Sequence, residues 1–127
     1  MAVLATIGFV WLTVDIDGPG SADRAKVTST AAQIDAFMDA LDAYHRDTGQ
    51  YPSTEEGLNA LRIRPSRVVN WQGPYLTRPV PQDPWGREYI YNFPGTHGVK
   101  PEIVAYGADG KPGGTDQNVD IESWKLE

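Results

Sequence analysis

Apolar side chains recur three and four residues apart along the first half of the chain. This spacing places them on one face of an α-helix, with aspartates on the opposite face. Ser21 is a favourable N-cap and Gly49 a favourable residue to follow the last turn. The pattern predicts one helix of about 27 residues, roughly 40 Å long. The apolar positions are Val27, Ala31, Ile34, Phe37, Met38, Leu41 and Tyr44, and the polar ones are Asp35, Asp39, Asp42 and Arg46.

A short second helix is predicted directly after the first. Ser53 and Glu56 form a capping-box pattern, in which each side chain accepts a hydrogen bond from the other residue's backbone. We therefore expect a helix over about residues 54–61 that buries Leu58 and Leu61. Residues 63–86 contain five prolines and are expected to be a loop. Residues 83–86, Asp-Pro-Trp-Gly, fit a type I turn.

Short apolar runs in the last third of the chain predict strands. They cover about residues 88–93, 103–106 and 121–126, and residues 94–98 are rich in turn formers. Helices followed by strands indicate an α+β fold. The expected architecture is a long helix packed on a small antiparallel sheet of about three strands.

The first 20 residues form a separate segment. Residues 2–14 are apolar apart from Thr6 and Thr13, but a transmembrane helix needs about 20 apolar residues. The run also lacks the basic start and cleavage site of a secretory signal. A buried or partner-binding segment, the remnant of a longer apolar helix, and residues left from cloning all remain open. We therefore divide the chain into residues 1–20 and a folded domain over residues 21–127.

Composition narrows the possible functions. The chain has 11 basic and 17 acidic residues, a net charge of −6, and no Lys/Arg-rich run, which argues against a nucleic-acid partner. It has no cysteine, which excludes disulfides and thiolate chemistry. The two histidines, His45 and His97, have no adjacent nucleophile motif. We therefore expect no enzymatic activity.

The segment from Tyr106 to Asp120 is the most unusual part of the sequence. Its fifteen residues include four glycines, one proline and three aspartates, which rules out a regular helix or strand. Calcium takes six to eight oxygen ligands from carboxylates, carbonyls and water, and this loop offers many. From the residues alone, a calcium site and a solvated loop with Asx turns remain equally open.

Five motifs in order make the chain resemble the major pseudopilin, the G subunit of bacterial type II secretion systems. The resemblance covers about residues 22–127. The motifs are Ala43-Tyr44 with DTGQYPSTEEGL at residues 47–58, NWQGPYL at 70–76, PQDPWG at 81–86, YGADG at 106–110, and Asp120-Ile121 with Trp124.

The resemblance implies a pilin-like fold and a structural function. Members are anchored in the inner membrane by one apolar N-terminal helix, with the globular domain in the periplasm, and they are methylated. Copies polymerise into a pilus-like filament that helps export folded proteins across the outer membrane. The implied partners are further copies, minor pseudopilins and the inner-membrane secretion platform. This chain departs from the family's start, because the basic leader and the Phe-Thr-Leu-x-Glu motif are missing, and Trp11, Asp15 and Asp17 are unusual for a membrane helix.

The resemblance also implies calcium as the bound cation. By position, Asp109 and Asp116 match the family's carboxylate ligands, and Tyr106 and a residue near Gln117 match its backbone carbonyl ligands. Asp120 is expected to be either a ligand or a brace of the loop. Two alternative functions remain: a type IV pilin-like subunit for adhesion or DNA uptake, and a small hydrolase that would need a polar pocket beside His45 or His97.

Overall fold

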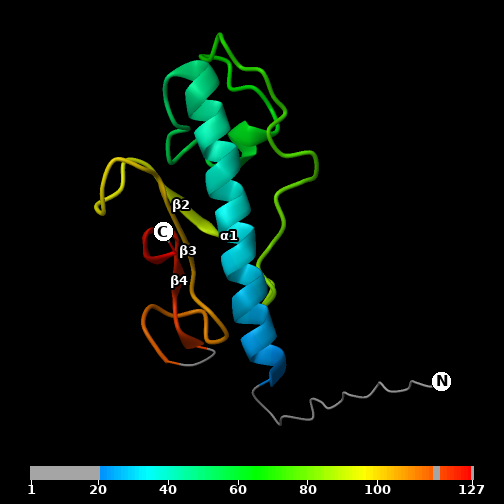
Figure 1. Ribbon diagram of the computed structural model, residues 1–127, viewed down its shortest axis with the longest axis vertical. Helices are drawn as coiled ribbons and strands as arrows, with labels where there is room; N and C mark the ends of the chain where they lie inside the picture. The colour runs from blue at the N-terminus through cyan, green and yellow to red at the C-terminus, as the bar shows by residue number, and fades with distance from the viewer. Residues whose placement is uncertain (1–20, 116–117, 127) are drawn as a thin grey trace, which may run out of the picture.

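One long helix forms the axis of the molecule (Figure 1). The computed structural model describes residues 21–115 and 118–126, so the predicted segment of residues 1–20 lies outside the described residues. Helix α1 covers Ser21–Thr48, which confirms the predicted helix. Asp23 lies in its first turn and Arg46 in its last, where each charge suits the helix dipole. Gly49, with φ of 81°, ends the helix and donates its N–H to the His45 carbonyl at 2.8 Å.

The strands form one antiparallel sheet along one side of α1 (Figure 1). The sheet has the order β2-β3-β4, with β2 at Ile90–Asn92, β3 at Glu102–Ala105 and β4 at Ile121–Glu122. Ile90 pairs with Val104, which in turn pairs with Glu122. A helix packed on a three-stranded antiparallel sheet confirms the predicted α+β class.

The apolar stripe of α1 forms one side of the core. Ile34, Phe37, Leu41 and Tyr44 are fully buried. The Phe37 ring meets Tyr89 edge to face, with 5.1 Å between the ring centroids. Burying an aliphatic or aromatic side chain of this size stabilises the fold by about 1.5–3 kcal/mol. All four residues of β3 are buried, so the central strand of the sheet is part of this core.

The predicted second helix is wrong in its first turn. The capping box does form, because Ser53 N–H donates to Glu56 at 3.0 Å and Glu56 N–H donates to Ser53 Oγ at 3.1 Å. Gly57, however, has φ of 63°, a left-handed conformation that an α-helix cannot contain. Residues 54–57 are therefore a turn, and only a 3-10 helix, η2 at Leu58–Leu61, follows.

Two of the predicted strands prove too long, whereas β3 at Glu102–Ala105 lies one residue from the predicted range of 103–106. Phe93 donates its N–H to the Thr54 hydroxyl at 2.9 Å, which takes it out of the ladder after Asn92. After β4 the chain turns into a 3-10 helix, η4 at Ser123–Lys125. Ser123 is buried there, and its hydroxyl accepts the Ile103 N–H at 3.0 Å. Side-chain hydrogen bonds thus end two of the strands.

The proline-rich segment is a loop, as predicted, and it runs along the other side of α1 from the sheet (Figure 1). Trp71 fixes it to η2 by donating its indole N–H to the Ala60 carbonyl at 2.9 Å. The turn at residues 83–86 is confirmed by the bond from Gly86 N–H to the Asp83 carbonyl at 2.9 Å. The Asp83 carboxylate accepts the Arg87 N–H at 2.9 Å and so holds the residue after the turn.

Candidate metal-binding loop

The acidic loop leaves β3 at Tyr106 and returns to β4 after Asp120. Gly114 shows why this path needs glycine. It has φ of 101°, and a Cβ there would lie 2.5 Å from the Asn118 carbonyl oxygen. The two sides of the loop therefore approach too closely for a side chain at residue 114. The two sides of the loop contact each other through their backbones, because glycine has no side chain that would hold them apart.

Asp109 lies at the exposed first turn of the loop. Its carboxylate accepts the Lys111 N–H at 3.1 Å, which is an Asx turn. This geometry suits a solvated loop and leaves the second carboxylate oxygen able to face a cation.

Asp120 lies at the other end of the loop and is half-buried. Its Oδ2 accepts the Gly113 N–H at 3.0 Å. Its Oδ1 is buried and has no hydrogen-bond partner among residues 21–115 and 118–126. A buried carboxylate oxygen without a partner is costly, and a bound cation removes that cost. Asp120 therefore fits an oxygen-ligated cation such as calcium.

The predicted ligand set is only partly described. Asp116 and Gln117 lie outside the described residues, and Tyr106 is half-buried at the end of β3. Within the described part of the chain, no group of three or more Asp, Glu, His or Cys residues is arranged to hold a metal ion. The described residues thus offer Asp109, Asp120 and the Tyr106 carbonyl from the two ends of one loop, and the full set stays a prediction.

Arg87 is a loop residue that the sequence analysis missed. Its guanidinium donates to the Gly107 carbonyl at 3.0 Å and to the Ala108 carbonyl at 3.4 Å. It also packs against Gly110, where φ is 66° and a side chain would clash with the guanidinium. Because Asp83 holds the Arg87 backbone, the turn at residues 83–86 braces the start of the acidic loop. The only sequence signal was a basic residue directly after that turn.

The surroundings of the histidines do not support a hydrolase. A hollow of about 240 Å³ beside His97 is lined by Glu102, Ser123 and Trp124 among others. His97 Nδ1 lies 2.7 Å from Glu102 and 3.2 Å from the Thr96 hydroxyl. Because one ring nitrogen meets both groups, this arrangement is not a relay from hydroxyl to carboxylate, which would use both nitrogens.

The rings of both histidines and the Ser123 hydroxyl make packing contacts or hydrogen bonds that stabilise the fold. The His97 ring stacks on Trp124 with 3.9 Å between centroids, and His45 stacks on Tyr51 at 4.3 Å. The Ser123 hydroxyl accepts a backbone N–H within the sheet.

The arrangement of these elements defines a pilin-like subunit: a long helix on a small antiparallel sheet, with a glycine-rich acidic loop between β3 and β4. The family model "Type II secretion system (T2SS), protein G" matches residues 19–124. The chain therefore belongs to the type II secretion system protein G family.

Individual relatives agree with this membership. The type II secretion system core protein G of Pseudomonas aeruginosa is 39% identical over 98% of this chain and 89% of its own length. That of Vibrio cholerae is 34% identical over 100% of this chain and 88% of its own. The crystal structure of the major pseudopilin from the type 2 secretion system of enterohaemorrhagic Escherichia coli superposes with a TM-score of 0.61. It is 38% identical and covers 82% of this chain and 88% of its own.

Family membership makes the chain a structural subunit of the type II secretion pseudopilus and an envelope-associated protein. The pseudopilin identity favours this function over the adhesion and DNA-uptake alternative. In the described residues, no helix has the length and apolar character of a membrane span.

Proposed function

We propose that copies of this chain assemble with one another, with minor pseudopilins and with the inner-membrane secretion platform into a filament. The filament helps export folded proteins through the outer membrane, and the subunit itself has no enzymatic activity. One observation carries this proposal: the protein G family model matches residues 19–124, the region that holds α1, the sheet and the acidic loop.

The proposed location is the inner membrane, with the domain of residues 21–127 in the periplasm. The apolar run of residues 2–14 supports this location, because it precedes the domain in the sequence and is the most apolar part of the chain's first 20 residues.

We also propose that calcium orders the loop between β3 and β4. Asp109, Asp116 and Asp120 would supply carboxylates, and Tyr106 and Gln117 would supply backbone carbonyls. Calcium would offset the repulsion among the carboxylates. The support is the buried, unpartnered Oδ1 of Asp120, together with an Asp109 carboxylate that has only one backbone partner in the described residues.

Electron microscopy tests the assembly. The full chain is produced with an epitope tag in a bacterium that has a type II secretion platform, and in the same strain without that platform. We expect immunolabelled filaments sheared from the first strain and only unassembled protein in the second. Unassembled protein in both strains, with the chain present in the membrane fraction, would contradict the proposal.

Calorimetric titration with calcium tests the loop. We expect one calcium per chain for the unaltered protein and binding weakened by about tenfold or more for Asp120→Asn, which removes one charged ligand. Asp35→Asn is the matched control, because Asp35 is an exposed aspartate on α1. Circular dichroism shows whether each variant is folded. Equal affinity for the Asp120 variant and the unaltered protein would make Asp120 a brace only.

A further inference from the structure

Two surfaces of opposite charge lie apart on the molecule. The first, which we name the acidic groove, has a volume of about 510 Å³ and lies between α1 and the segments that flank β3 and β4. It is lined by Asp35, Met38, Asp39, Asp42, Lys100 and Ser123.

The acidic groove keeps an excess of negative charge. Lys100 Nζ lies 3.6 Å from Asp42, so one of the three aspartates is paired. Asp35 and Asp39 are exposed and have no ion pair with any residue of the described chain. Met38 is almost fully buried at the base of the groove. The groove therefore offers two free carboxylates beside an apolar base.

The second surface, which we name the basic loop, covers residues 62–70. Ile63 is 67% exposed and Val69 is 85% exposed. Isolated exposed apolar side chains are common on protein surfaces, so the charge of the loop, rather than these two side chains, marks it as a docking surface. Arg64 is exposed beside Ile63, and in the described residues no carboxylate pairs with it.

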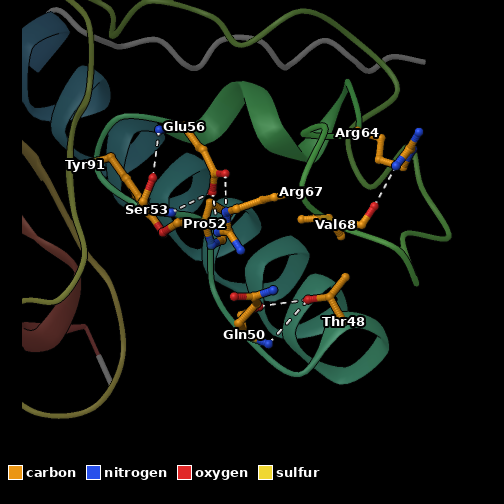
Figure 2. A network of polar contacts seen from close by, with 9 residues as sticks. All are labelled: Thr48, Gln50, Pro52, Ser53, Glu56, Arg64, Arg67, Val68 and Tyr91. Carbon is orange, nitrogen blue, oxygen red and sulfur yellow. Dashed lines mark hydrogen bonds and ion pairs between the residues drawn. The ribbon is translucent and has the colours of Figure 1, made fainter.

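The basic loop is held in one shape (Figure 2). Arg64 donates to the Val68 carbonyl at 2.6 Å, and Val68 itself is buried in the core. The Arg67 guanidinium donates two hydrogen bonds of 2.6 Å to the Glu56 carboxylate. A preorganised loop loses little conformational freedom on binding. Its exposed face therefore presents a guanidinium and two apolar side chains in fixed positions.

The two surfaces cannot meet within one copy. The groove is lined by α1 residues between Asp35 and Asp42. The basic loop lies near the C-terminal end of α1 (Figure 1). Asp39 is nine residues before Thr48, or about 13 Å along the helix. When two different patches of one chain are complementary, the contact is heterologous and generates an open filament unless a rotation closes it. A second copy of this chain is therefore the partner that the charges fit.

We propose that the basic loop of one copy docks into the acidic groove of the next. Arg64 faces Asp35 and Asp39, and Ile63 and Val69 cover the apolar side of the contact. This inference rests on the proposed filament and names the surfaces that join its globular domains. Exposed ion pairs are weak and are screened by salt, so the contact fixes orientation between neighbours and loosens at high ionic strength.

Disulfide trapping tests the contact directly, because the chain has no cysteine of its own. Two tagged copies, one Asp39→Cys and one Arg64→Cys, are produced together in filament-forming cells and oxidised. We expect a mixed dimer that carries both tags. The control replaces Asp39→Cys with Glu88→Cys, an exposed position outside the acidic groove, and should give little dimer.

Charge reversal gives an independent measure. Arg64→Glu and Asp39→Arg should each lower the number of filaments by about fivefold or more, and the double variant should restore it. Circular dichroism and electron microscopy of the same cells report folding and filament formation separately.

Three results would overturn the proposed contact. The first is that filaments form but the disulfide-linked dimer between positions 39 and 64 stays at the level of the control. That result would leave the proposed filament function intact. Another is a cross-link from residue 64 to a different protein. The third is the absence of filaments from the unaltered chain, which overturns the filament proposal as well.

Discussion

Glu102 holds the turn that joins β2 to β3, and its replacement by glutamine should loosen that turn. Glu102 is 7% exposed. Its Oε2 lies 2.7 Å from each of three nitrogens: the Thr96 N–H, the His97 N–H and His97 Nδ1. Glutamine keeps the size and one acceptor oxygen but removes the negative charge.

The expected cost follows from these bonds. A hydrogen bond to a charged group contributes about 1.5–3 kcal/mol, against about 1 kcal/mol for a neutral one. Weakening three such bonds should lower the free energy of unfolding by about 2 kcal/mol. For a domain of roughly 100 residues this corresponds to a Tm about 8 °C lower.

The pH dependence has a definite sign. Burial, the largest influence, raises the pKa of Glu102, but hydrogen bonds from His97 and Thr96 together lower it below its usual 4.5. A lowered carboxyl pKa stabilises the folded state above the unfolded pKa, and this stability is lost as the pH falls through the folded value. The Tm difference between the unaltered chain and Glu102→Gln should therefore shrink below about pH 4.5.

Thermal melts followed by circular dichroism from pH 7 to pH 3 measure both effects. Glu88→Gln is the matched control, because Glu88 is exposed and should melt like the unaltered chain. A Glu102 variant that melts within about 2 °C of the unaltered chain at pH 7 would refute the argument. So would a difference that stays constant across the pH range.

Two further stability predictions use the same melts. Glu56→Ala removes the acceptor of the Ser53 N–H and the partner of Arg67, and should cost about 1–2 kcal/mol because the ion pair is partly exposed. An unchanged Tm would mean that the turn forms without its capping box. Tyr91→Phe removes the buried hydrogen bond to the Pro52 carbonyl at 2.7 Å and should also cost about 1–2 kcal/mol. A variant as stable as the unaltered chain would show that this carbonyl finds another donor.

The elements with a long periodic pattern could be predicted from the sequence. Helix α1 repeats its apolar stripe over many turns, so its bounds were correct. The ends of the shorter elements depend on contacts between distant residues, which a local pattern does not contain. Phe93 leaves β2 because it bonds Thr54, 39 residues away, and Ser123 ends β4 where its hydroxyl meets Ile103, 20 residues away.

In the candidate site, too, residues within one local pattern could be predicted, whereas residues that depend on contacts with distant parts of the chain could not. Asp109 and Asp120 could be proposed as ligands from the sequence because they share one unusual loop with its glycines. Arg87 was missed because its contacts with Gly107 and Ala108 span 20 and 21 residues. The acidic groove likewise combines α1 with Lys100 and Ser123, which only the folded sheet brings together.

The central claim is that this pseudopilin depends on calcium to order the loop between β3 and β4. A thermal melt with excess calcium, compared with a melt in chelator, tests it most directly. A ligand that binds only the folded state adds about 2.7 kcal/mol at a concentration 100 times its Kd, so the Tm should rise by roughly 10 °C. Asp109→Ala should abolish the rise. Equal melting temperatures with calcium and with chelator would contradict the claim.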